Sequence, residues 1–195
     1  MKKFLTLLSF LACFSFANAI KCTFNGDLSV LKGEKAVNIK YTYNDMIVGS
    51  MSEEAYLEKK VSEYNAKKPG RGDEFKKSWE RNKQSVYPVS FNQLFEKSCG
   101  IKANTISDEK YTLIVNTNYF EPGFNVGVVR RNAEISVVIK LVKTDEPDKT
   151  IAEIVITNSP GRTVSGYDYD VASRVSESYA KAGKECGKII KKNNK

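Results

Sequence analysis

Three segments of alternating residues, followed by one long amphipathic segment, occupy the second half of this sequence. Every second residue is apolar, aromatic or Thr from Tyr111 to Tyr119, and every second residue is apolar from Ala133 to Leu141. A third segment, IAEIVIT at 151–157, follows the turn sequence TDEPDK. A period of two residues is typical of a strand with one buried face. The three segments therefore predict an antiparallel meander.

A long helix is predicted after the meander. Its apolar residues recur at intervals of three or four, which places them on one helical face: Val171, Val175, Tyr179, Ala182, Cys186 and Ile189. A neighbouring row of small residues consists of Ala172, Ser176, Gly183 and Gly187. Glycine inside a helix costs about 1 kcal/mol relative to alanine, so these glycines indicate that the helix lies close against the sheet.

The first half of the sequence predicts a strand hairpin and then a helix. Ile20, Cys22 and Phe24 alternate with polar residues, Asn25-Gly26-Asp27 predicts a turn, and residues 37–43 alternate again. A helix is expected at about 52–65, where Ser50 and Glu53 have the spacing of a capping box.

Two further helices are predicted before the meander. In KKPGRGDEFKKSW, Asp73 is placed as the N-cap of the second helix, with Phe75 and Trp79 on one face. The third follows Pro88, with Ser90 and Gln93 as its capping box and Gly100 at its C-terminal end. The fold class is therefore α+β: a single sheet with an N-terminal strand hairpin and a C-terminal antiparallel meander, helices packed on one face, and a long C-terminal helix.

Arg71-Gly72-Asp73 is also the tripeptide that adhesive proteins present to integrin receptors. A match of three residues arises easily by chance, and each of these residues has a structural role at the start of a helix. The adhesive alternative would require Arg71 and Asp73 to stand on a protruding loop.

The first nineteen residues have the pattern of a secretory signal peptide. Basic residues precede an apolar run from Phe4 to Phe16, and Ala17-Asn18-Ala19 is a small-x-small cleavage site. The run is shorter than the about 20 apolar residues of a membrane-spanning helix. We expect cleavage after Ala19, residence in the periplasm or outside the cell, and a single domain at 20–195. Lipid attachment at Cys13 is an alternative, although the apolar run continues past it.

Charge and composition limit the partners and the chemistry. The formal net charge is +8, and loss of Lys2 and Lys3 lowers it to +6. The basic residues are scattered, so no nucleic-acid partner is expected. The tail KIIKKNNK could contact anionic lipid through Lys188, Lys191, Lys192 and Lys195, or could be a solvated helix end.

The residue types needed for common catalytic sites are scarce. The chain has no histidine, which excludes His-based triads, Cys–His pairs and most zinc sites, and we expect no cofactor and no metal. Cys22, Cys99 and Cys186 remain after cleavage and allow one disulfide with one free thiol. Asp168 and Asp170 are a candidate carboxylate pair, and helix capping is the alternative role for both.

Two loops of the predicted meander share one edge of the sheet, beside the start of the last helix. Loops 121–131 and 158–168 contain aromatic and arginine side chains, a combination that suits an anionic or carbohydrate ligand or a partner protein. An alternative is that long loops simply carry such residues. The candidate binding residues are Phe124, Arg130, Arg131, Arg162, Tyr167 and Tyr169.

Several segments resemble a family of small exported bacterial envelope proteins of unassigned function. They are YTYNDMIVG followed by SEEAYLEKK, PGRGDEFKKSWERN, and the closing VSESYAKAGKECGKIIKK. The C-terminal half is also similar to the TolB amino-terminal domain-like module of envelope lipoproteins and assembly factors. This chain departs from those proteins in its three-helix insertion and in lacking a clear lipobox. The resemblance implies a binding or scaffolding role and transfers no catalytic residue.

Two functional classes follow. The first is a non-catalytic exported binding or scaffolding module of the bacterial cell envelope, which engages an envelope protein or an anionic or carbohydrate component through loops 121–131 and 158–168. The second is a histidine-free glycan hydrolase with paired carboxylates. Two acidic side chains about 5 to 9 Å apart across a cleft would favour the hydrolase.

Overall fold

The computed structural model describes residues 19–104, 108–126, 129–161 and 171–194. The α-helices are α1 (Glu53–Lys67), α2 (Arg71–Arg81), α3 (Tyr87–Cys99) and α4 (Val171–Asn193). The strands are β1 (Lys21–Gly26), β2 (Ala36–Thr42), β3 (Ile47–Val48), β4 (Met51–Ser52), β5 (Lys102–Asn104), β6 (Tyr111–Glu121), β7 (Phe124–Val126), β8 (Val129–Arg131), β9 (Glu134–Lys143) and β10 (Glu146–Pro160).

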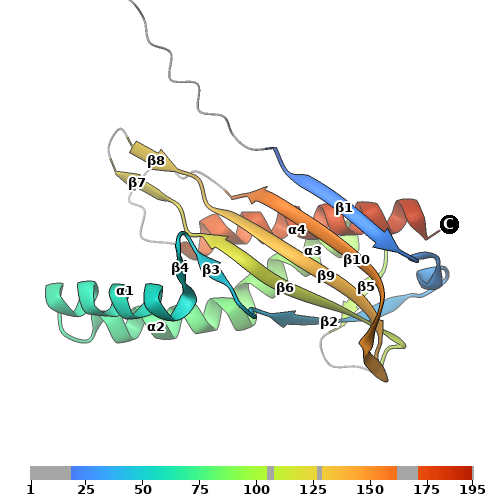
Figure 1. The fold of residues 1–195 in the computed structure, drawn as a ribbon, viewed down its shortest axis with the longest axis horizontal. Coiled ribbons are helices and arrows are strands. Elements are labelled where there is room, and N and C mark those ends of the chain that lie inside the picture. Colours follow the sequence, from blue (N-terminus) through green and yellow to red (C-terminus); the bar gives the residue numbers. More distant parts are fainter. Residues whose placement is uncertain (1–18, 105–107, 127–128, 162–170, 195) are drawn as a thin grey trace, which may run out of the picture.

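An open, mixed sheet with helices against one face makes this an α+β fold, as predicted. The strand order is β1-β10-β9-β6-β2-β5, with β3 and β4 attached beside the end of β6. Helices α3 and α4 lie behind the sheet, while α1 and α2 project beyond one end of it (Figure 1). The predicted meander is confirmed, because β9 pairs antiparallel with both β6 and β10.

The meander supplies most of the sheet's share of the hydrophobic core. Val115 of β6, Ile139 of β9 and Ile154 of β10 are in register across the three strands and are buried. Their neighbours along each strand point to the opposite face and are more exposed, for example Ile114 and Val155. This is the alternation that the sequence indicates.

The predicted N-terminal hairpin is wrong. Strand β1 pairs antiparallel with β10 at one edge of the sheet, whereas β2 pairs parallel with β6 near the other edge. The chain passes between these two positions through the short 3₁₀ segment Ser29–Leu31. Leu31 in this segment and Leu28 just before it are fully buried. An alternating pattern defines the buried face of a strand but not its neighbour in the sheet, so Asn25-Gly26-Asp27 was compatible with either arrangement.

The second and third predicted helices are parts of one continuous helical run. A π-helical segment, Asn82–Val86, joins α2 to α3, and the N–H of Tyr87 donates to the carbonyl of Asn82. Pro88 has no N–H to donate to the preceding turn, which favours a local change of register. The predicted capping box at Ser90 is therefore wrong: its hydroxyl donates to the carbonyl of Val86 inside the run. Gly100 does end α3 in the left-handed conformation, as predicted.

Both remaining helix starts differ from the predicted caps. The N-cap of α1 is Ser52, whose hydroxyl accepts from the N–H of Ala55, and not Ser50. Helix α2 begins two residues before Asp73, with Gly70 as N-cap at φ 82°. A glycine adopts this positive φ at little cost. The helix therefore begins earlier in the chain than predicted.

The integrin-type tripeptide therefore lies within the first turn of α2. Gly72 is buried, its N–H donates to the side chain of Asn65, and an added Cβ would overlap the backbone of Val61. The guanidinium group of Arg71 lies 5.5 Å from the centre of the Tyr64 ring. The tripeptide is an element of α1–α2 packing and does not stand on a protruding loop.

Helix α4 makes the predicted close approach, but to another helix and not to the sheet. An added Cβ on Gly183 or Gly187 would overlap the backbone carbonyl of Phe91 or Phe95 in α3. The apolar stripe of α4, including Tyr179 and Cys186, is buried against the sheet and α3. Cys22, Cys99 and Cys186 are all free thiols. None of the described helices has the length and apolar character needed to cross a membrane.

Candidate functional site

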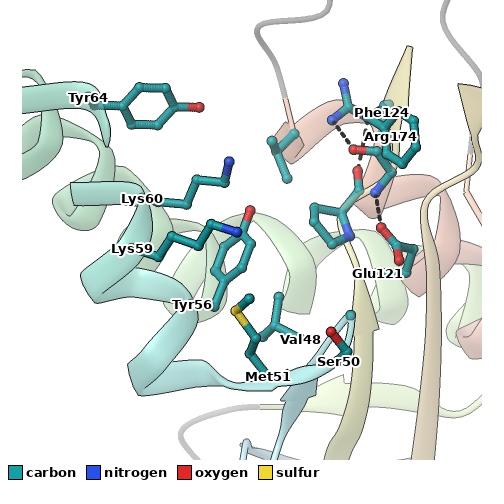
Figure 2. Close-up of a pocket in the computed structure, with 14 residues that line it drawn as sticks. Val48, Ser50, Met51, Tyr56, Lys59, Lys60, Tyr64, Glu121, Phe124 and Arg174 are labelled. Carbon is teal, nitrogen blue, oxygen red and sulfur yellow. Dashed lines mark hydrogen bonds between the residues drawn. The ribbon is translucent and has the colours of Figure 1, made fainter. Parts of the chain in front are cut away.

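A cavity of about 420 Å³ lies between α1 and the end of β6 (Figure 2). Four segments form its walls: the turn between β3 and β4, one face of α1, residues 121–124, and the first turn of α4. Its lining residues are Val48, Gly49, Ser50, Met51, Tyr56, Lys59, Lys60, Tyr64, Glu121, Pro122, Gly123, Phe124, Val171 and Arg174.

One face of α1 supplies two lysines and two tyrosines to the cavity. These are Tyr56 and, three, four and eight positions after it, Lys59, Lys60 and Tyr64. This is the spacing of one helical face. Figure 2 shows the amino groups of both lysines and the two hydroxyl groups in the space between α1 and the opposite wall. The Lys60 Nζ lies 6.0 Å from the centre of each tyrosine ring and 2.9 Å from Glu63.

Packing outside the cavity holds the two tyrosine rings in place. Tyr56 packs on Trp79 at a ring separation of 5.4 Å, and Tyr64 packs on Phe75 at 5.1 Å. Burial is the main cause that raises the pKa of Tyr56 far above its usual value of about 10. Its hydroxyl is therefore protonated at neutral pH and can donate a hydrogen bond into the cavity.

The opposite wall is fixed by two buried charged residues. Arg174 of α4 is 4% exposed, and its Nε and Nη2 donate to the carbonyl oxygens of Pro122 and Gly123 at 3.1 and 3.3 Å. Glu121 is 6% exposed and accepts from the N–H of Gly123 and from Arg131 Nε at 2.9 and 2.8 Å. Together these contacts hold residues 121–123 in one conformation.

The described surroundings of the cavity carry an excess of positive charge. Lys59, Lys60 and Arg174 line it, and Arg131 lies directly behind Glu121. Of the nearby carboxylates, Glu63 contacts Lys60, Glu121 contacts Arg131, and Glu134 lies near both Glu121 and Arg131. Within the described part of the chain no ion pair is formed by Lys59, which is exposed. Such a surface attracts anions more strongly than cations.

The structure describes only part of the predicted binding site. Phe124 lines the cavity and is 43% exposed, and Arg131 lies behind the cavity wall with its Nη2 3.4 Å from the Tyr119 hydroxyl. Arg130 belongs to β8, but its side chain lies outside the described part of the structure, as do Arg162, Tyr167 and Tyr169. The six residues therefore remain a prediction as a set.

The predicted arrangement of the two loops agrees with the strand register. Glu134 of β9 is opposite both Glu121 and Pro160, so the first loop and the start of the second lie at the same edge of the sheet. Within the first loop, β7 pairs antiparallel with β8, and Phe124 is opposite Arg131. Strands of three residues are too short for a period of two to identify them in a sequence.

The sequence alone did not indicate the wall that α1 contributes. The spacing of Tyr56, Lys60 and Tyr64 is visible in EEAYLEKKVSEY, but it also fits an ordinary solvent-facing helix surface. That this face meets residues 121–124 depends on the place of α1 beyond the end of the sheet. No local pattern in the sequence encodes that long-range placement.

Among the described residues, no two carboxylates face each other in this cavity. Asp168 and Asp170, the candidate catalytic pair, lie outside the described residues. Glu121 is the only acidic side chain among the described lining residues. Acidic residues instead line a second hollow of about 410 Å³ between α1 and α2, together with Leu57, Val61 and Lys76, and no aromatic residue of the described structure lines it.

The chain has a distant likeness to several solved structures. A PelC dodecamer from Paraburkholderia phytofirmans aligns with a TM-score of 0.41 and 10% identity, over 84% of this chain and 96% of that one. A protein from Xanthomonas campestris, of the family DUF330, aligns with a TM-score of 0.36 and 19% identity, over 53% of this chain and 57% of the other. At these scores no inference about this chain follows. No protein-family model and no curated protein matches the sequence.

Proposed function

We propose that this protein is a non-catalytic, exported binding or scaffolding module of the bacterial cell envelope. It takes part of an envelope component into the cavity beside α1 and engages the rest with the adjoining loops 121–131 and 158–168. The signal-peptide pattern of residues 1–19 supports export.

One observation carries the binding role: both walls of the cavity are held in place by contacts within the protein. Tyr56 and Tyr64 are packed on α2, while Arg174 fixes the carbonyl groups of Pro122 and Gly123. A site that is already formed loses little conformational freedom on binding, which leaves more of the contact energy as affinity.

The test is to fill the cavity and measure what the protein still retains from the envelope. Ser50 is exposed at the cavity wall, so Ser50→Trp places an indole in the cavity. Ser62 is exposed on α1 and lines neither hollow, so Ser62→Trp is the matched control. Immobilised protein lacking residues 1–19 is incubated with envelope extract, and retained components are quantified by mass spectrometry. The proposal expects Ser50→Trp, and not Ser62→Trp, to lose specific components.

A second variant tests the loops. The triple substitution Arg130→Ala, Arg131→Ala and Arg162→Ala removes three of the predicted side chains. Loss of the same components that Ser50→Trp loses, with an unchanged circular dichroism spectrum, supports one continuous site. Equal retention by the parent protein and all variants would reject the cavity and the loops as the binding surface.

A further inference from the structure

The chemistry of the cavity walls specifies a class of ligand, an inference that rests on the proposed function. Lys59 and Lys60 offer amino groups, and Tyr56 and Tyr64 offer hydroxyl groups, from one face of α1 (Figure 2). Lysine has donors but no acceptor, and a tyrosine hydroxyl donates through its single hydrogen. The α1 wall is therefore rich in donors and needs a ligand rich in acceptor oxygens.

The opposite wall does not compete for these donors. The carboxylate of Glu121 accepts from Arg131 and from the N–H of Gly123. The carbonyl oxygens of Pro122 and Gly123 accept from Arg174. Each of these acceptors has a partner within the protein, and no described hydrogen bond joins them to Lys59, Tyr56 or Tyr64, so these three donors are available to a ligand. A carboxylate or phosphate group forms the strongest hydrogen bonds with lysine and so fits best.

The cavity also has an apolar part that can hold a ring. Phe124 is 43% exposed at the rim, and Val48, Met51 and Val171 contribute to the same lining. An aromatic face beside polar donors is a combination that can hold the flat, C–H-bearing face of a sugar. The volume of about 420 Å³ is at the lower end of the about 300–1,000 Å³ that is usual for ligand sites, so the cavity accommodates a short saccharide or the end of a chain.

We propose that the cavity binds an acidic saccharide. Its carboxylate or phosphate group lies between Lys59 and Lys60 and accepts from the Tyr56 hydroxyl, and its ring packs against Phe124. Lys60 already contacts Glu63 at 2.9 Å, whereas Lys59 has no such partner in the described structure. Lys59 therefore contributes most of the attraction for the anion.

The test measures binding of defined probes by isothermal titration calorimetry. Trigalacturonate is the acidic probe, and triacetylchitotriose is a neutral trisaccharide of the same length. Phosphatidylglycerol vesicles and inorganic phosphate distinguish a lipid headgroup and a free anion from a saccharide. The expected result is that trigalacturonate binds, that triacetylchitotriose binds at least tenfold more weakly, and that higher salt weakens the acidic probe's binding.

Substitutions test which lysines bind the acidic probe. Lys59→Ala should weaken trigalacturonate binding about fivefold or more, and Lys60→Ala somewhat less, since each removes a charged hydrogen-bond donor. Lys59→Arg should retain most of the binding. Lys77→Ala is the matched control, because Lys77 is exposed on α2 and lines neither hollow. Circular dichroism and thermal denaturation confirm that each variant is folded.

The outcomes separate this inference from the proposed function. Failure of trigalacturonate to bind, equal binding of the neutral probe, or undiminished binding by Lys59→Ala and Lys60→Ala would each overturn the acidic saccharide. Tight binding only to vesicles or to phosphate would overturn it as well. If Ser50→Trp still loses envelope components in any of these cases, the binding module stands and only its ligand class is wrong.

Discussion

At the scale of single residues, Tyr179 connects α4 to the sheet through a buried hydrogen bond. Its hydroxyl lies 2.7 Å from the hydroxyl of Thr117 on β6, and both side chains are almost completely buried. The ring stacks on Tyr87 at a separation of 4.8 Å and an angle of 4°. The residue thus combines apolar burial with a polar contact that requires one relative position of helix and sheet.

Removing that hydroxyl group should destabilise the protein. Tyr179→Phe leaves the Thr117 hydroxyl buried with one partner fewer, so we expect the free energy of unfolding to fall by about 1–2 kcal/mol. Urea denaturation followed by circular dichroism measures this. Thr117→Val alone should cost a similar amount, and the double variant should cost clearly less than the sum. Strict additivity would show that the two hydroxyl groups do not interact.

The sequence supports part of this arrangement. Tyr179 belongs to the apolar stripe of the predicted helix, and Thr117 takes an inward position in the alternating segment. Their pairing was not predictable, because the residues are 62 positions apart and neither pattern identifies a partner. The same limitation applies to the cavity, where Phe124 was identified from its loop but Lys59 and Tyr56 were not.

At the scale of elements, the α3–α4 contact depends on glycine. The backbone carbonyl of Phe91 occupies the space that a Cβ on Gly183 would need. We expect Gly183→Ala to lower the free energy of unfolding by about 1–3 kcal/mol, since the overlap outweighs the gain of about 1 kcal/mol in helix propensity. Thermal denaturation measures the change. Lys184→Ala, at an exposed position of the same helix, is the control and should change little.

The π-helical segment between α2 and α3 makes a second prediction at this scale. Because Tyr87 donates to Asn82, the carbonyl of Lys83 is left to accept from the Tyr43 hydroxyl at 2.8 Å. Tyr43→Phe removes that donor and should cost about 1–3 kcal/mol of unfolding free energy. Denaturant unfolding checks the cost. A change within about 0.3 kcal/mol would mean that solvent replaces the tyrosine at this carbonyl.

Elements with strong periodicity were predictable, and their junctions were not. The alternating segments and the stripe of α4 gave the correct element types, because burial of one face determines the pattern. The caps were misplaced at α1, α2 and α3. Gly70, with its positive φ, lets α2 begin at Arg71. Before Pro88 the hydrogen-bond register changes, so the helical run continues where the proline predicts a break. Both depend on backbone conformations that side-chain patterns do not reveal.

At the scale of the whole molecule, sheet order was the least predictable property. The α+β fold class and the antiparallel meander follow from the order of the alternating and helical patterns along the chain. The positions of β1 and β2 at opposite sides of the meander depend on Leu28 and Leu31 packing into the core, so that the intervening chain crosses the end of the sheet. That crossing also places β2 parallel to β6, with the helical run between them, and brings α1 to the cavity.

Buried tyrosines couple the stability of the whole fold to alkaline pH. Burial raises the pKa of Tyr41 and of Tyr179 well above the usual value of about 10. Below pH 10 both residues are protonated in the folded and the unfolded chain, so they add no pH dependence. Above pH 10 the unfolded chain releases these protons while the folded chain keeps them. The free energy of unfolding should therefore fall by about 1.4 kcal/mol per pH unit for each residue, until unfolding occurs.

Alkaline titration followed by absorbance at 295 nm and by circular dichroism tests this coupling. The chain has ten tyrosines, and the exposed ones should ionise reversibly with the fold intact. Tyr179, which is fully buried, should ionise only together with the loss of helical signal, because an uncompensated phenolate inside the core is strongly disfavoured. Tyr41 is partly buried against the core and should ionise well above pH 10. The variants Tyr41→Phe and Tyr179→Phe should each reduce the pH dependence of stability above pH 10. Ionisation of all ten tyrosines near pH 10 in a folded protein would contradict their burial, because a solvent-accessible phenol titrates at its ordinary pKa whichever element carries it.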